Sequence, residues 1–341
     1  MIQQLFRRSY WIIGLGWAAV LLAVGARILS RNSILPETQQ TETHRGVTLR
    51  EFPNLEYVKN VPLFPGRSGA WIPALNNPSY VNPTEAAAWL KSDDPVVGLR
   101  LGSASRAYPT KILNFHEIIN DTIDGKEVAV TYCPLAGSAL AFYREFEGKV
   151  LSFSVADVLY ESTLVMVDEP TGSLWYQLRG EAVKGPLKGR SLATQPVILC
   201  TWRDWLSAHP DSLVLSYLTG YSTNYASNYW SNPYRGNTNL HSPPGFPITY
   251  LDESRPAKEL VVGVALGART IAFPSSSLQA ADARLELNGR TLVAQLSPSG
   301  QFPLAFWETA EGRSPAPSIN CYWFAWKAAH WKSEVWTQPN K

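Results

Sequence analysis

One stretch of the chain returns later with nearly the same pattern, and this internal repeat constrains the fold more than any other feature. Residues 96–113, VVGLRLGSASRAYPTKIL, align without a gap with residues 261–278, VVGVALGARTIAFPSSSL. Eight of the 18 aligned positions are identical. Two long segments that match at a constant offset indicate a duplicated structural unit.

The repeat continues through a second pair of segments. DGKEVAVTYCPLAGSALAFY aligns with LNGRTLVAQLSPSGQFPLAFW after a one-residue deletion, which places Cys133–Pro134 on Ser297–Pro298. Both copies are typical of an alternating strand, a turn with proline and a second apolar strand. The even-numbered residues of the first strand should face one side and Cys133 the other. Because the cysteine occurs in one copy only, it fits a site that specialised after duplication.

Composition favours a β-rich protein. The chain has 341 residues, 45% of them hydrophobic, with 13 Trp, 15 Tyr and 25 Pro but only 17% charged residues. We expect an α+β fold that is predominantly β, with two homologous β-rich repeats (about 95–155 and 260–325) packed as one unit. Each repeat alone has too few strands to bury both faces. The alternative is a pair of domains with an open cleft.

The N-terminus carries the most apolar segment of the chain. Arg7 and Arg8 precede an uninterrupted apolar run from Trp11 to Ala26. We expect residues 1–29 to form a signal-anchor or transmembrane helix, residues 30–62 a polar linker, and residues 63–337 an extracytoplasmic duplicated β-rich domain.

A cleaved signal peptide is the main alternative, because Val24-Gly25-Ala26 resembles a cleavage site. A buried helix of a soluble domain is the third. For a bacterium, the first interpretation predicts a single-pass inner-membrane protein with most of the chain in the periplasm, and cleavage predicts a secreted protein. The net charge of +2 without a basic block gives no support to a nucleic-acid partner.

Local patterns predict several short elements. Residues 82–92 should form a helix with Thr84 as N-cap, and residues 201–210 a helix between Thr201 and Pro210. Residues 114–122, NFHEIINDT, should form a short helical or turn segment. The strand that ends at Cys133 brings its side chain to the rim of a sheet, where functional groups often lie.

Cys133 and His116 are the leading candidates for chemistry. A cysteine nucleophile needs a neighbouring base, and His116 lies shortly before the cysteine strand. The same thiolate and imidazole are ligands for a transition metal ion. The alternatives are a buried inert thiol and a histidine that caps a turn or lies in the core. Cys200 and Cys321 are expected to be structural, and no disulfide framework is indicated.

The long loop at 219–249 is rich in Tyr, Asn, Ser and Pro. Loops of that length inside a domain are usually functional or disordered. Its aromatic side chains could line a binding cleft, or pack the loop onto the sheet. The binding candidates are Tyr221, Tyr225, Trp230 and Tyr234. His330 stands among tryptophans at helical spacing, which is more typical of a core than of a ligand cage.

Several motifs in register resemble the bacterial domain-of-unknown-function family 3179 over roughly residues 62–337. They are IPALNNPSYV, RAYPTKILNFHEIINDT, VTYCPLAGS, LYESTLVMVDEPTGSLWYQLRGEAVKGPL and CYWFAWKAAHW. The resemblance implies a domain without an established activity. Members of the family often carry C-P-L-C, whereas this chain has Ala136 at the position of the second cysteine. A dithiol couple or metal clip from that pair is therefore unavailable here.

Three functions follow from these observations. The first is a membrane-anchored extracytoplasmic binding or accessory protein that takes a small ligand or a metal ion near Cys133. The second is a thiol-dependent enzyme with Cys133 as nucleophile and His116 as base. The third is a structural subunit of a membrane complex, with a membrane protein as partner. No G-x-S-x-G, phosphate-loop or H-E-x-x-H motif occurs in the sequence.

Overall fold

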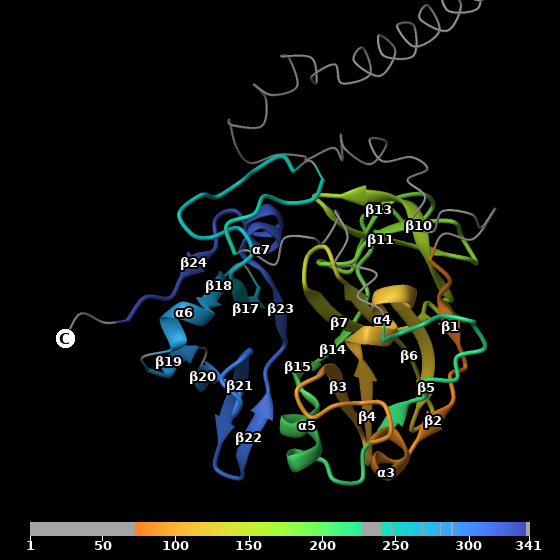
Figure 1. Ribbon diagram of the computed structural model, residues 1–341. Coiled ribbons are helices and arrows are strands. Elements are labelled where there is room, and N and C mark those ends of the chain that lie inside the picture. The colour runs from red at the N-terminus through yellow and green to blue at the C-terminus, as the bar shows by residue number, and fades with distance from the viewer. Residues whose placement is uncertain are drawn as a thin grey trace, which may run out of the picture. The chain divides into compact units, whose positions relative to one another are not determined.

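The computed structural model describes residues 72–226, 240–246, 248–267, 269–279, 281–287 and 289–338 (Figure 1). All of them belong to one compact unit that is rich in strands and has few helices, which confirms the predicted β-rich class. The predicted anchor and linker lie outside the described residues. Within the described part of the chain, no helix is long and apolar enough to span a membrane.

A five-stranded sheet is built around the first of the two aligned segments. Its strand order is β15-β3-β4-β16-β2. The strands are β2 (Tyr80–Val81), β3 (Pro95–Leu101), β4 (Ala104–Pro109), β15 (Ile198–Thr201) and β16 (Leu213–Leu215). β15 pairs antiparallel with β3, and β16 pairs parallel with β4.

The largest sheet contains the second aligned segment, in the order β1-β5-β6-β7-β23-β17-β18-β24, with β14 paired to β7. Its strands are β1 (Leu75–Asn76), β5 (Ile118–Ile123), β6 (Lys126–Cys133), β7 (Ser138–Tyr143), β14 (Thr194–Gln195), β17 (Leu260–Leu266), β18 (Arg269–Pro274), β23 (Ser318–Tyr322) and β24 (Glu334–Val335). A single residue pair, Asn320 with Ala139, joins β23 to β7. The sheet therefore brings residues that are far apart in sequence together where β7 meets β23.

Three smaller sheets complete the β structure. They are β8 (Glu145–Phe146) with β9 (Lys149–Val150); β10 (Phe153–Tyr160), β11 (Thr163–Asp168), β12 (Leu174–Tyr176) and β13 (Glu181–Lys184); and β19 (Ala283–Leu287), β20 (Arg290–Leu296), β21 (Pro303–Thr309) and β22 (Gly312–Pro315). In Figure 1, β19 to β22 (blue) lie on the opposite side of β23 from β3 to β6 (orange to yellow).

The helices are short and two of them differ from the predictions. The helices of the described residues are α3 (Pro83–Ala86), α4 (Thr110–His116), α5 (Trp202–Ala208), α6 (Ser275–Leu278) and α7 (Trp323–Ala329). Asn82, not Thr84, is the N-cap of α3, because its side chain and that of Glu85 form a reciprocal capping box. Thr201 caps α5 as predicted, by accepting from the Asp204 N–H.

The segment 114–122 is not one helical or turn unit. His116 ends α4, Glu117 turns the chain at φ 55°, and β5 follows at once. The apolar run after Glu117 pairs with β6 as a strand, so tertiary pairing overrides the local helical pattern.

The two aligned segments form hairpins with the same register. Val96 pairs with Pro109 in one, and Val261 with Pro274 in the other. In each hairpin the first strand pairs antiparallel with another strand, which is followed by a seven-residue helix. The second strand of the hairpin pairs with a short parallel strand. We call β3, β4, β15, α5 and β16 the first module, and β17, β18, β23, α7 and β24 the second module.

Strand β6 separates two apolar clusters, as its alternation predicted. Val128 and Val130 belong to the cluster with α4 and β3, whereas Ala129 and Cys133 belong to the cluster with β10 to β13 and α7. Cys133 therefore lies in the core on the side away from the first module.

Candidate functional site

Cys133 is a buried thiol at the end of β6. Only 1% of its surface is exposed, and its Sγ accepts the Leu164 N–H at 3.3 Å. The pKa of the thiol is raised to about 12, mainly by burial and also by the nearby charge of Glu117, against the lowering effect of backbone hydrogen bonds. In this conformation the thiol is protonated at neutral pH and is a weak nucleophile.

The hydrogen bonds of His116 go to residues other than Cys133. Its Nδ1 lies 2.8 Å from the Pro73 carbonyl oxygen and its Nε2 2.6 Å from the Tyr225 hydroxyl. Since a carbonyl only accepts, Nδ1 carries the proton and Nε2 accepts from Tyr225. Burial lowers the pKa of His116 to about 4. Both ring nitrogens are therefore engaged in holding the chain together around a neutral imidazole.

The first residues of the aromatic loop, 219–226, pack against His116. Tyr225 is buried, its hydroxyl also bonds Thr219 Oγ1 at 2.5 Å, and its ring lies 5.6 Å from that of His116. Tyr221 lies 5.2 Å from the same imidazole and is 40% exposed. Trp230 and Tyr234 lie outside the described residues. Tyr221 and Tyr225 thus pack against the end of α4.

The turn between β10 and β11 is a buried feature that sequence patterns did not indicate. Glu161 and Ser162 both have positive φ, 51° and 55°, although neither is glycine. The Glu161 carboxylate accepts the Thr249 N–H at 2.7 Å, and Ser162 Oγ accepts the Phe246 N–H at 3.2 Å. Turns with positive φ usually contain glycine, and neither of these two positions does, so the sequence did not indicate the turn. The turn fixes the segment that leads into the second module.

The described residues contain no group of three or more His, Cys, Asp or Glu side chains placed to hold a metal ion. The three cysteines are free and buried, and they lie in three different strands. Burial raises the pKa of Cys200 to about 12 and raises that of Cys321 as well. Each thiol is therefore protonated at neutral pH and enclosed in the core, Cys133 and Cys321 in one apolar cluster and Cys200 in another.

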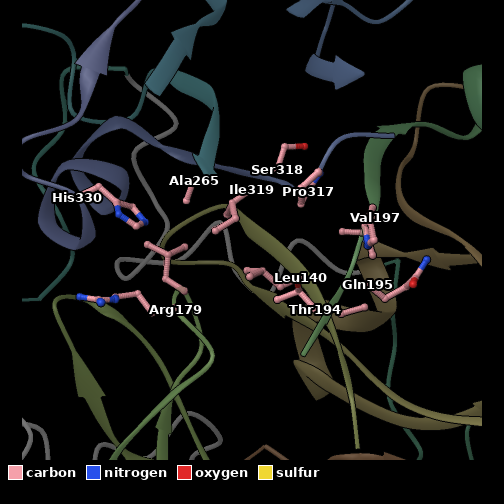
Figure 2. A pocket seen from close by; sticks show the side chains of 13 residues that line it. Leu140, Arg179, Thr194, Gln195, Val197, Ala265, Pro317, Ser318, Ile319 and His330 are labelled. Carbon is pink, nitrogen blue, oxygen red and sulfur yellow. The ribbon is translucent and has the colours of Figure 1, made fainter. Parts of the chain in front are cut away.

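A pocket lies where β7 meets the second module (Figure 2). Its volume is about 190 Å³. Apolar side chains and a few polar ones line it, among them Leu140, Val197, Ile319, Arg179, Gln195 and His330. In Figure 2, Arg179 and His330 lie toward one end, and Gln195 and Val197 toward the other. We call this space the junction pocket. Apolar walls with a few polar groups are typical of small-molecule sites.

His330 is held in the junction pocket by the end of α7. Its ring stacks on Trp326 at 4.2 Å between centroids, and its backbone N–H donates to the Trp326 carbonyl at 2.7 Å. The Trp326 indole N–H donates to Ser333 Oγ at 2.7 Å. His330 packs against a tryptophan, as expected for a residue in a tryptophan core. It also lines a pocket, which that expectation did not include.

The first module repeats this arrangement residue by residue. His209 stacks on Trp205 at 4.1 Å, and the Trp205 indole N–H donates to Ser212 Oγ at 2.8 Å. The sequence carries the signal in CTWRDWLSAHPDS at 200–212 and CYWFAWKAAHWKS at 321–333, which share cysteine, two tryptophans, Ala-His and serine. Sequence reasoning missed this match and predicted only that both cysteines are structural.

The two modules differ in the residue that faces the histidine. Arg100 stands near the end of β3, and its charge adds to burial in lowering the pKa of His209. At the corresponding place near the end of β17 stands Ala265, which lines the junction pocket together with His330. The first module thus carries a long, exposed arginine at this position, whereas the second carries a methyl group that lines the pocket with His330.

Comparison with protein families gives one match. A family described as "Protein of unknown function (DUF3179)" matches residues 70–333. The search of curated proteins finds no match, and neither does the search of solved structures.

Proposed function

The chain belongs to the DUF3179 family, and we propose that it is a binding or accessory protein that takes a small molecule in the junction pocket. The observation that supports this best is the contrast between Ala265 and Arg100. The same backbone framework carries both residues, and the pocket lies where the smaller one stands. A binding site formed in this way needs no rearrangement of the scaffold.

We infer that the two modules arose by duplication and then diverged at this position. The hairpin registers, the Trp–His stacks and the indole–serine hydrogen bonds agree between them. The two modules differ where one carries Arg100 and the other Ala265, and Ala265 lines the junction pocket. This difference favours a function acquired in the second module.

The size of the pocket limits the ligand. A volume of about 190 Å³ lies below the roughly 300–1,000 Å³ of drug-sized sites. We therefore expect a compact molecule of a few carbon atoms rather than a peptide or a nucleotide.

The proposal retains the predicted location. We propose that residues 1–29 anchor the chain in the inner membrane and that the pocket works outside the cytoplasm, where small solutes are captured before transport or processing. This part rests on the sequence of the N-terminus alone. Protease accessibility of the domain in intact spheroplasts tests it, and protection of the domain from added protease would reject it.

The thiol-dependent enzyme remains the alternative proposal. The geometry supports it less well, because Cys133 is buried at 1% exposure and His116 bonds Pro73 and Tyr225 instead. It would require a conformation in which both side chains are released. The alkylation experiment described in the Discussion decides between an enclosed and a reactive thiol.

The binding proposal is tested by a small-molecule library and the substitution Ala265→Arg. Saturation-transfer NMR on the purified full-length chain should find compounds that compete for one site. Ala265→Arg should abolish their signals without unfolding the protein, because the first module accommodates arginine at the equivalent place. Ala265→Met, which fills space without charge, should act likewise. Compounds that bind both variants as well as wild type would reject the pocket as the site.

A further inference from the structure

The junction pocket is lined by a basic residue but by no acidic one. Its lining includes Arg179 and His330, and none of the described lining residues is acidic. Gln195 is engaged with its neighbours, since its Oε1 accepts from Tyr143 at 2.7 Å and its Nε2 donates to the Arg100 carbonyl at 3.1 Å. The pocket therefore offers cationic and neutral donors but no anionic partner for a ligand.

Arg179 is well placed to receive an anion. Its backbone is fixed between buried Leu178 and Gly180, where φ is 59° and an added Cβ would lie 2.7 Å from the Phe142 ring. Its guanidinium pairs with Glu181 at 3.2 Å, but the two side chains are 50% and 32% exposed. Exposed pairs of this kind contribute little and compete weakly. A guanidinium has five N–H donors, so one carboxylate neighbour leaves others for a ligand.

The remaining wall is mostly apolar, with Thr194, Gln195 and Ser318 as its polar residues. Leu140 and Ile319 lie between the Arg179–His330 end and the Val197 end in Figure 2. A ligand that fills the space should thus carry its charge at one end and hydrocarbon along the rest. Carboxylates suit a guanidinium because two parallel N–H···O bonds can form.

We propose that the junction pocket binds a small monocarboxylate with a short alkyl chain, its carboxylate at Arg179 and its chain against Leu140 and Ile319. This inference rests on the proposed function, because it names the ligand class of the same site. It assigns Arg179 as the residue that selects for negative charge.

Butanoate and butanamide test the charge requirement by isothermal titration of the full-length chain. The two probes have nearly the same shape and differ in charge. Butanoate should bind about tenfold or more tightly than butanamide, as expected for a hydrogen bond between ions. Arg179→Gln should remove this preference. Arg190→Gln is the matched control, because Arg190 is an exposed arginine that pairs with Glu147 outside the pocket.

The outcomes separate this inference from the proposed function. If butanamide binds as tightly as butanoate and Ala265→Arg abolishes both, the pocket binds small molecules without selecting carboxylates, and the inference is wrong. If butanoate binds equally to wild type and Arg179→Gln, the assignment of Arg179 is wrong. If neither probe binds, the inference is overturned, and the library screen on wild type and Ala265→Arg then decides the proposed function independently.

Discussion

The indole ring of Trp326 lies so close to Gly263 that a Cβ atom on the glycine would be 2.1 Å from ring carbon Cζ3. In the first module, the same added atom on Gly98 would be 2.1 Å from Cε3 of Trp205. Neither glycine has a positive φ, so close approach rather than backbone conformation requires glycine at both places. Each contact sets how closely the helix that carries the tryptophan packs on its hairpin. It therefore also sets the position of the histidine that follows that helix.

Gly263→Ala and Gly98→Ala should therefore both destabilise the protein. Forcing a methyl group against a packed indole should cost about 2–3 kcal/mol in the free energy of unfolding, from urea denaturation. Ala265→Ser, on the same strand but exposed, is the control and should cost less than about 0.5 kcal/mol. A second substitution, Trp326→Leu, should relieve part of the cost of Gly263→Ala. Additive losses would show that the indole contact is not the cause.

His330→Gln and His209→Gln should separate binding from stability. Both remove a ring that stacks on tryptophan, so both should lower the free energy of unfolding by similar amounts, about 1 kcal/mol. Only His330 lines the junction pocket. We expect weaker ligand binding in His330→Gln alone, measured by titration with a library compound. Equal effects of the two variants on affinity would contradict the assignment of His330 to the site.

The buried thiols should make stability fall in alkali. The pKa of Cys133 is raised from 9.0 to about 12, so the folded state keeps a proton that the unfolded state releases. The stabilisation is complete below about pH 9 and is lost as pH rises toward 12; at pH 10 the loss is about 1.4 kcal/mol per thiol. Urea midpoints at pH 8 and pH 10 check this, and Cys133→Ser should show a smaller loss than wild type.

Alkylation rates give an independent view of the same thiols. Native protein at pH 8 should react slowly with iodoacetamide at all three cysteines, and rapidly after denaturation, because all three are buried. One fast thiol in the native state that disappears in Cys133→Ser would instead support the enzyme proposal. The comparison needs no knowledge of a substrate.

His116 should make stability fall in acid. Its pKa is lowered from 6.5 to about 4 by burial, so the unfolded state takes up a proton that the folded state refuses. The stabilisation is complete above about pH 6.5 and is lost as pH falls toward 4, by about 2 kcal/mol at pH 5. Urea midpoints at pH 7 and pH 5 measure it. His116→Gln should lose this part of the pH dependence, and an unchanged profile would show that another group is responsible.

The strands were predictable from sequence where apolar alternation is strong. The alternation around Cys133 correctly separates the two faces of β6, and Thr201 correctly marks the start of α5. The alternation fails at His116, where α4 ends and a strand begins without a turn signal between them. The local pattern there suits a helix, and pairing with β6 decides otherwise.

The candidate site was less predictable for a physical reason. A motif search favours rare residues such as Cys133, but burial makes that thiol inert in this conformation. The junction pocket is lined by Arg179, Ala265 and His330, which come from three distant parts of the chain. These parts come together where β23 pairs with β7. The available signal was a comparison of the two copies, in which Ala265 replaces Arg100.

The most direct measurement is a crystal soak with a mixture of small brominated acids, amides and alcohols, followed by anomalous diffraction at the bromine edge. We predict a bromine peak in the junction pocket, in contact with Ala265 and Ile319, that vanishes in crystals of Ala265→Arg. Bromine peaks beside Cys133 or under the Tyr221–Tyr225 loop, with the junction pocket empty, would contradict the account.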